Sequence, residues 1–191
     1  MGNALPSTPA STVYTGGMSV NITFLGGADT VTGSKYLVQH GGQQLLVDCG
    51  LFQGYKQLRL RNWRPLPLNP NQVDAVILTH AHLDHSGYVP LLVREGFRGK
   101  VWCTPATRDL ARILLPDSGH IQEEDAAFAN RKGFSRHAPA LPLYTEDDAQ
   151  RSLKYLRTVQ THQVFEPIHG WQAQLFGAGH ILGAASLLLT V

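Results

Sequence analysis

The sequence predicts an α/β fold in which helices and sheets pack in layers. Short apolar runs rich in β-branched residues alternate with segments of helical periodicity, and residues 75–78 form the clearest of these runs. The chain opens with strand-like segments joined at Gly41-Gly42, which predicts an antiparallel start. Strand and helix patterns then alternate, as in a sandwich of sheets and helices. At 191 residues the chain is long enough for one domain with a buried core.

Strand patterns in the first half end at polar or glycine-containing positions. The expected strands cover residues 20–25, 35–38, 44–48, 75–78 and 100–103. A helix is expected over residues 88–95, with Gly96 as its stop signal. A second helix is expected to begin at Thr104 and Pro105, a cap followed by proline at the first helical position, and to run to about Leu115.

The second half continues the alternation. Ser118 would cap a further polar helix, and residues 131–143 have the composition of a loop. Thr145 and Asp148 then form a near capping box, with aspartate in place of glutamate at the third helical position. The core-facing stripe of that helix is expected to hold Ala149, Leu153 and Leu156. The last expected strands are residues 171–175 and 186–191, the second of them apolar and central.

Composition and charge exclude several classes of protein. The chain is 43% hydrophobic and 16% charged, which is ordinary for a globular α/β domain, and its net charge of +2 does not by itself indicate nucleic-acid binding. Cys49 and Cys103 form no Cys-x-x-Cys pair and no disulfide framework, so a reducing, cytoplasmic location is expected. Residues 1–17 carry no charged side chain and lack the basic start and apolar core of a secretory signal, so they are expected to be a disordered leader. No apolar run approaches the length of a membrane span.

Three histidines and an aspartate fall within six positions directly after the strand over residues 75–78. Because alternate residues of an extended chain share a face, His80 and His82 are expected to project together. Imidazole nitrogens and carboxylate oxygens are ordinary ligands of zinc and similar divalent ions. The four donors suggest two neighbouring metals, one on His80 and His82 and the other on Asp84 and His85. The alternative is a polar strand end with solvated histidines.

Four segments resemble those of a known family, and they cover residues 30–34, 47–54, 80–85 and 179–186. The His-Ala-His-Leu-Asp-His motif at 80–85 resembles the signature of the metallo-β-lactamase superfamily. The other three segments resemble its β-CASP branch, which consists of RNA-processing nucleases. The resemblance runs from about residue 20 to the last residue. It implies an αββα sandwich, RNA as the substrate, and a two-zinc centre at which a metal-activated hydroxide attacks a phosphodiester.

The resemblance also implies roles for individual residues. His180, which lies in a turn of small residues, would be the third imidazole on the first metal. Asp48 and Asp84 are the carboxylates expected to serve catalysis: Asp84 as a metal ligand, and Asp48 as the residue that orients the histidines and sets their tautomers. For Asp48 the alternatives are direct ligation of the metal and a hydrogen-bonded turn residue. The candidate substrate contacts are Thr32, Ser34, Arg59, Arg61 and His120. A solvated loop around the two arginines and a polar helix surface at His120 are the alternatives.

The family pattern continues past its third motif to a bridging aspartate, an inserted RNA-clamping domain and a final histidine ligand. These 191 residues stop before those features, so residues 18–191 are expected to form the amino-terminal part of the domain, with one metal or a partial site. Two other functions remain open: a thioester or lactam hydrolase of the same superfamily, and a non-catalytic metal-binding piece. The latter would associate with itself or with a missing carboxyl part, and exposed apolar side chains at Leu187, Leu188, Leu189 and Val191 would support it.

Overall fold

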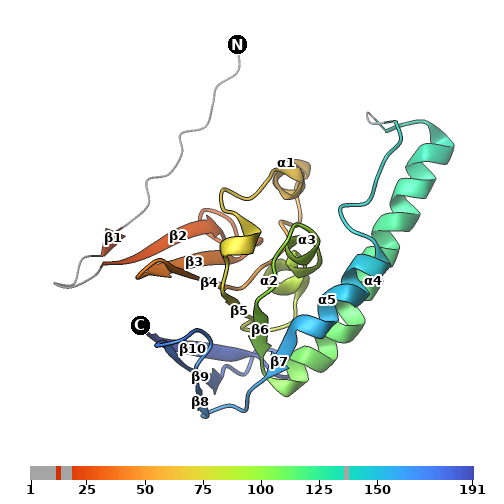
Figure 1. Ribbon diagram of the computed structural model, residues 1–191. Helices are drawn as coiled ribbons and strands as arrows, with labels where there is room; N and C mark the ends of the chain where they lie inside the picture. Colours follow the sequence, from red (N-terminus) through yellow and green to blue (C-terminus); the bar gives the residue numbers. More distant parts are fainter. Residues whose placement is uncertain (1–11, 14–18, 136–137) are drawn as a thin grey trace.

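The computed structural model describes residues 12–13, 19–135 and 138–191. The predicted combination of sheet and helix layers is confirmed (Figure 1). Helices cover one face of a seven-stranded sheet, and a three-stranded sheet packs against its other face. Three of the four layers of the expected αββα sandwich are therefore present in the described part of the chain. No helix in that part is long and apolar enough to cross a membrane.

The larger sheet begins antiparallel and continues parallel. In spatial order its strands are β1 (Thr12–Val13), β2 (Val20–Gly26), β3 (Lys35–His40), β4 (Gln43–Val47), β5 (Ala75–Ile77), β6 (Lys100–Cys103) and β7 (Leu156–Thr158). Strands β1 to β4 pair antiparallel, as predicted, and β4 to β7 pair parallel. Strand β1 lies within the segment expected to be a disordered leader; the rest of residues 1–17 falls outside the described residues.

The smaller sheet is antiparallel and has the order β10-β9-β8. Its strands are β8 (Val164–Phe165), β9 (Gln172–Gly177) and β10 (Ala185–Thr190). Strand β10 was expected to be central, but among the described residues it pairs with β9 alone and occupies the edge. Its side chains alternate between exposed and half-buried positions, since only one face packs against the core.

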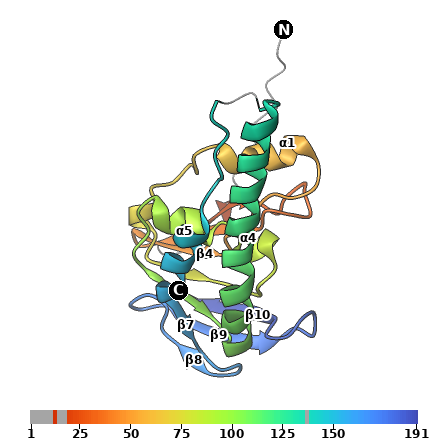
Figure 2. The same ribbon diagram turned by 90° about the vertical axis from the view of Figure 1, so that its right-hand side faces the viewer.

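The helices form the outer layer and differ greatly in length (Figure 2). They are α1 (Lys56–Arg59), η1 (Leu60–Trp63), η2 (Pro70–Gln72), α2 (Leu83–Ser86), α3 (Val89–Arg94), α4 (Pro105–Lys132), α5 (Glu146–Ser152) and η3 (Leu153–Tyr155), where η marks a 3₁₀ helix. The 28-residue α4 runs along the whole side of the molecule, with α5 packed beside it.

The alternation of side chains along the strands divides the core into two. Leu46 and Val76 point toward the helices, and their cluster includes Leu92 of α3 and Leu115 of α4. The neighbouring residues of the same strands point to the other face, where the cluster includes Leu45, Ala75, Ile77, Trp171 and Leu175. Because successive residues of a strand face opposite ways, β4 and β5 are buried on both sides, as strands between two layers must be.

Helix α4 was expected to end near Leu115 and to be followed by a separate helix capped at Ser118, and both expectations are wrong. The helix continues without a break, with Pro116 inside it. Proline in a helix interior costs about 3 kcal/mol, and burial of Leu115, Pro116 and Gly119 offsets that cost. The Ser118 hydroxyl does not cap a helix, because it accepts a hydrogen bond from the Tyr144 hydroxyl at 2.9 Å.

The predicted capping box at the start of α5 is confirmed. The Thr145 hydroxyl accepts from the Asp148 N–H at 3.0 Å, and the Asp148 carboxylate accepts from the Thr145 N–H at 3.1 Å. The predicted stripe is only partly correct, since Ala149 is buried on α5 but Leu156 begins β7. The helix ends after two turns, and a single 3₁₀ turn redirects the chain into the sheet.

Candidate metal centre

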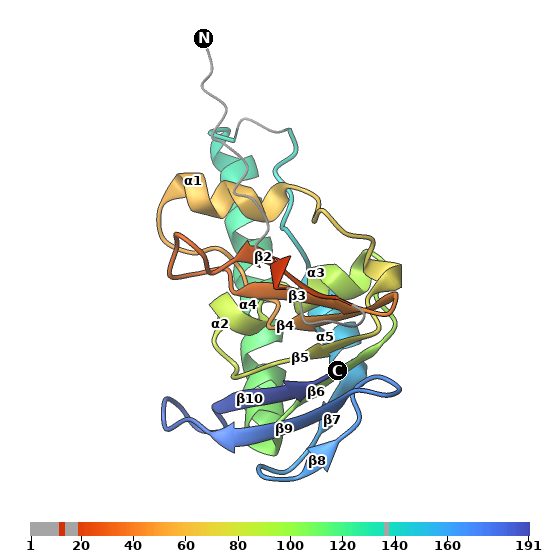
Figure 3. The same ribbon diagram turned by 90° about the vertical axis from the view of Figure 1, so that its left-hand side faces the viewer.

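The histidine cluster lies beyond the carboxyl end of β5, where the β9–β10 turn reaches the same side of the molecule (Figure 3). After β5 ends at Ile77, the chain turns sharply into α2. The Ser86 hydroxyl stabilises this turn by donating to the carbonyl of Ala81 at 2.8 Å. The placement of the cluster at a strand end, predicted from the sequence, is confirmed.

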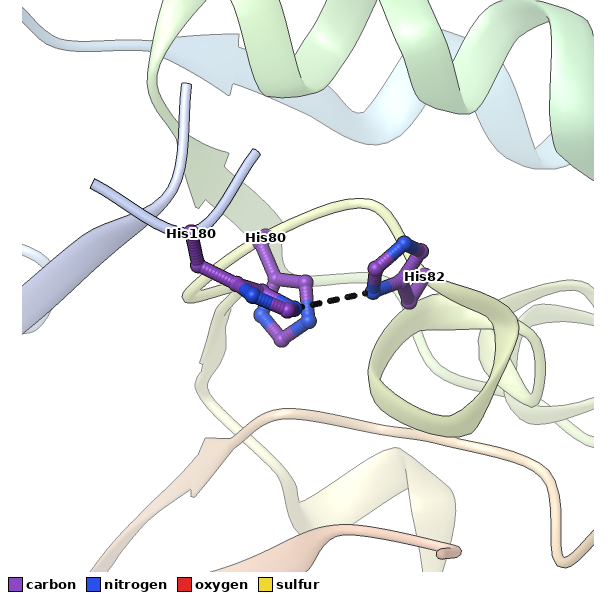
Figure 4. Close-up of side chains that lie close together, drawn as sticks. All are labelled: His80, His82 and His180. Carbon is purple, nitrogen blue, oxygen red and sulfur yellow. Dashed lines mark hydrogen bonds between the residues drawn. The ribbon is translucent and has the colours of Figure 1, made fainter. Parts of the chain in front are cut away.

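Three imidazoles converge on one point (Figure 4). One ring nitrogen from each of His80, His82 and His180 lies within 4.8 Å of the other two. The centroid of each ring is 5.0 Å from the centroids of the others. Nε2 of His180 lies 3.2 Å from Nδ1 of His82. Two nitrogens bound tetrahedrally to zinc at ordinary bond lengths are about 3.3 Å apart, so this donor set fits a divalent ion.

Asp84 and His85 lie beside this trio. The His85 ring is 3.9 Å from the His80 ring, measured between centroids. Nε2 of His85 and Oδ2 of Asp84 are 3.6 Å apart. Both side chains are partly exposed, at 25% for His85 and 20% for Asp84. The pair therefore offers a nitrogen and an oxygen donor next to the three imidazoles, as expected for a neighbouring half-site.

Asp48 connects the two halves of the centre. Its carboxylate accepts from the Thr79 N–H at 2.8 Å and from the Thr79 hydroxyl at 3.0 Å. Its Oδ2 lies 2.7 Å from Nδ1 of His85, and the Thr79 oxygen lies 3.0 Å from Nδ1 of His80. A proton on Nδ1 of each ring satisfies both contacts and leaves each Nε2 available. This is the arrangement that the orienting role predicted for Asp48 requires.

The environment favours different charge states at neighbouring rings. Burial, together with the charge of His85, lowers the pKa of His80 to about 4, so that ring is neutral near pH 7. For His85, burial alone would lower the pKa. The hydrogen bond that His85 donates to Asp48 and the negative charges of Asp48 and Asp84 outweigh burial and raise its pKa.

Main-chain hydrogen bonds hold the segment that carries Asp84 and His85. The Ser34 N–H donates to the Asp84 carbonyl at 2.8 Å, and the Cys49 N–H donates to the His85 carbonyl at 2.7 Å. Gly50 passes so close that a Cβ would lie 1.6 Å from the Asp84 carbonyl oxygen. Only glycine allows this approach, so the loop after β4 fits directly beneath the centre.

A buried lysine joins the two supporting loops. Lys35 is 1% exposed, and its ammonium donates to the carbonyl of Gly33 at 3.4 Å and to that of Gly50. The nitrogen also lies 4.7 Å from the centre of the Phe52 ring and 4.9 Å from that of Tyr88. Burial lowers the pKa of Lys35 to about 8. The side chain ties the loop before β3 to the loop after β4.

Two predicted substrate contacts have partners inside the protein. Ser34 is buried, and its hydroxyl donates to Oδ2 of Asp48 at 3.2 Å. The Thr32 hydroxyl accepts from the Gln53 N–H at 3.1 Å. Both residues thus belong to the network around Asp48 and the loop that follows it.

The other predicted contacts lie at the surface. Arg59 and Arg61 are exposed on α1 and η1, and the Arg61 guanidinium stands 5.2 Å from the Phe52 ring. His120 is exposed on α4, with its two ring nitrogens each 3.6 Å from a carboxylate. The contacts described for these side chains involve none of the three imidazoles.

Several residues that shape the centre were not predicted from the sequence. They are Thr79, Lys35, Thr104, Thr107 and Gly183, whose contacts at the centre all depend on the fold. Two signals were available in the sequence: Thr79 immediately precedes the histidine motif, and Gly183 lies in the segment 179–186 that resembles the family.

The family model described as "Metallo-beta-lactamase superfamily" matches residues 28–152, which is more than half of the chain. The chain belongs to the metallo-β-lactamase superfamily. Solved superfamily structures share the fold: a metallo-β-lactamase from Cronobacter sakazakii (a mutant of its HARLDQ motif) has a TM-score of 0.53 at 19% identity over 89% of this chain and 56% of that one. BJP-1, a subclass B3 metallo-β-lactamase of Bradyrhizobium japonicum, has a TM-score of 0.52 at 18% identity over 90% of this chain and 55% of that one.

Curated relatives within the superfamily act on or with nucleic acids, to judge by their names. Ribonuclease TTHA0252 of Thermus thermophilus is 38% identical over 167 residues, which are 87% of this chain and 34% of that protein. Transcription termination factor FttA of Methanosarcina mazei is 36% identical over 171 residues, which are 87% of this chain and 24% of that protein. The chain thus spans about a third or less of the length of these relatives.

Proposed function

We propose that this chain is the amino-terminal part of a β-CASP-type, zinc-dependent ribonuclease that hydrolyses RNA phosphodiester bonds. The observation that carries the proposal is the convergence of His80, His82 and His180 beside the Asp84–His85 pair. The similarity to a ribonuclease and to a transcription termination factor supports RNA as the substrate. Buried, unpaired thiols at both cysteines suit a reducing compartment, and we place the protein in the cytoplasm.

In this proposal His80, His82 and His180 hold one zinc ion, and Asp84 and His85 contribute to a second. Zinc supplies a water of lowered pKa and stabilises charge on the phosphodiester oxygens. Asp48 orients His85 directly and His80 through the Thr79 hydroxyl. The main-chain bonds from the loops before β3 and after β4 keep the second pair in place.

The segment after Asp48 is proposed to contact the RNA backbone. Residues 49–73 contain no acidic side chain, and four of them are basic. Tyr55 and Trp63, which are 85% and 56% exposed, offer ring faces for base stacking. The Asn62 side chain bonds both the N–H and the carbonyl of Phe52 at 2.8 Å, so the segment is fixed to the loop at the centre. Figure 3 shows α1 above α2, on the side that carries the β9–β10 turn.

Metal content and cleavage of several substrates test the proposal together. We expect the 191-residue chain to bind zinc, as measured by mass spectrometry of the metal, and to cleave radiolabelled RNA at defined zinc. His82→Ala removes one of three convergent donors and should abolish both properties. His169→Ala is the matched control, because its side chain is fully exposed and pairs with Glu166 away from the centre.

Three outcomes would change the conclusion. Zinc content unchanged in His82→Ala would refute the ligand assignment. Turnover of thioester or lactam substrates without RNA cleavage would identify a small-molecule hydrolase instead. About one ion per chain with no turnover of any substrate would show a non-catalytic metal-binding piece, which self-association in sedimentation experiments would support.

A further inference from the structure

We propose that Thr104 and Thr107, at the amino-terminal end of α4, are positioning residues for His180. They act through one carbonyl, that of Gly183, in the turn that carries the histidine. The inference rests on the proposed metal centre, since it concerns how one of its three imidazoles is held.

Two hydroxyls converge on this carbonyl from a distant part of the chain. The Thr104 hydroxyl donates to the Gly183 oxygen at 2.7 Å, and the Thr107 hydroxyl donates to it at 3.0 Å. The two threonines are 3% and 0% exposed. The Gly183 carbonyl is half-buried, and both of its hydroxyl donors are buried, so moving the turn away from α4 would leave these groups without partners.

The turn can approach α4 only because residue 183 is glycine. Its φ is +84°, in the left-handed region, and a Cβ there would lie 2.5 Å from the Thr107 nitrogen. Both the backbone conformation and the close contact therefore exclude a side chain.

A short turn held by main-chain hydrogen bonds links Gly183 to His180. The Ala184 N–H donates to the Ile181 carbonyl at 2.9 Å, which closes the turn directly after the histidine. At its base, the Ala185 N–H donates to the carbonyl of Thr79, also at 2.9 Å. The turn is thus anchored at one end beside the His80 motif and near its tip on α4. The His180 side chain is exposed. Its position is therefore fixed by the hydrogen bonds of the turn and not by packing around the ring.

Thr107 is the better residue to test, because Thr104 also caps α4 by accepting from the Thr107 N–H. Thr107→Val keeps the shape and removes only the hydroxyl, whereas Thr107→Ser keeps the hydroxyl. We expect Thr107→Val to weaken binding of cobalt or zinc by about tenfold or more, as loss of an outer hydrogen bond does at other metal sites. Thr107→Ser should bind within about twofold of wild type by the same reasoning.

The experiment titrates each 191-residue variant with Co²⁺, follows the visible absorption of the ion, and measures zinc by competition. Histidine NMR spectra of the metal-free proteins give a second readout, in which Thr107→Val should shift and broaden the His180 resonances. Ser152→Ala is the matched control, because it removes an equally buried hydroxyl that bonds the Ala149 carbonyl in α5. It should lower the free energy of unfolding without changing metal affinity.

The possible failures are distinguishable. If wild type binds no metal, or His180→Ala binds as wild type does, the metal centre is wrong. If His180→Ala loses the metal but Thr107→Val binds it normally with unchanged His180 resonances, the positioning role is wrong. Should Thr107→Val not fold, Gly183→Ala replaces it, because the added methyl group pushes the turn from α4. Normal metal affinity in that variant would equally overturn the inference.

Discussion

Asp48 has a backbone φ of +58°, a left-handed conformation that is costly for residues with a Cβ, although less so for aspartate and asparagine than for most others. Its carboxylate is almost fully buried, which adds a desolvation cost. Hydrogen bonds from Ser34 and Thr79 and the contact with His85 offset both costs. A residue keeps such a conformation where its surroundings fix it. Here the conformation directs the Asp48 carboxylate to both halves of the candidate metal centre.

The substitution Asp48→Asn replaces one carboxylate oxygen by an amide nitrogen and so tests the role of these hydrogen bonds. The amide group places donor hydrogens where the carboxylate accepts from Thr79 and Ser34, so at least one buried donor loses its partner. We expect the free energy of unfolding in a metal chelator to fall by about 1–3 kcal/mol, as measured by urea denaturation. Asp109→Asn, at an exposed aspartate paired with Arg108, should change it little. Equal stability of wild type and Asp48→Asn would contradict the role assigned to this carboxylate.

At the scale of elements, the start of α5 follows its local sequence signal, whereas α4 continues past a residue that locally favours a break. The capping box at Thr145 and Asp148 starts α5 where the sequence predicts. Pro116, by contrast, does not end α4, because the residues around it are buried against α5. Gly119 permits this contact, since a Cβ there would lie 2.7 Å from the main chain of Thr145. Packing thus overrides the local preference for a break.

The cap of α5 yields a prediction about pH. Burial tends to raise the pKa of Asp148, but its hydrogen bonds with Thr145 and the contact with Arg94 lower it below the ordinary value of 3.8. The stabilisation is therefore complete above the unfolded-state pKa and is lost as the pH falls through the folded-state pKa. Asp148→Ala should be less stable than wild type by about 1 kcal/mol at pH 7.

Urea denaturation of Asp148→Ala and wild type over a series of pH values measures this difference. The gap between the two should narrow as the pH drops below 3.8, when the carboxylate becomes protonated. Asp147→Ala serves as the control, since Asp147 is exposed and pairs with Arg151 outside the box. A gap that stays constant from neutral to acidic pH would show that the charge of Asp148 is irrelevant to the cap.

At the scale of the whole molecule, three segments that follow strands place the candidate site residues on one side of the fold. The loop after β4, the motif after β5 and the β9–β10 turn all reach the metal centre. The basic segment at α1 and η1 lies on that same side (Figure 3). The opposite end of α4 extends far from it, with exposed apolar side chains at Phe128 on the helix and at Phe134 just beyond its end. An RNA strand bound at the centre is therefore expected to pass over α1.

The salt dependence of RNA binding tests this path. Each phosphate contact with single-stranded RNA contributes about 0.7 to the slope of log affinity against log salt concentration. Arg59→Gln combined with Arg61→Gln should therefore reduce the slope by about 1.4 and weaken binding at low salt. Arg151→Gln removes an equally exposed charge on α5, where Asp147 partners it, and should leave the slope unchanged. An identical slope in the double variant would place the RNA elsewhere.

Local patterns along the chain were sufficient for the α/β class, most strand positions, the α5 cap and the donors at residues 80 to 85. These features depend on neighbours in sequence, where periodicity and capping act directly. Tertiary contacts determined four other features. They are the placement of His180 beside His82, the edge position of β10, the continuity of α4 through Pro116, and the hydrogen bonds from two threonines to Gly183. The Thr107–Gly183 and His82–His180 contacts join residues 76 and 98 positions apart in the chain. Their energies come from burial and hydrogen bonding that exist only once the layers have packed.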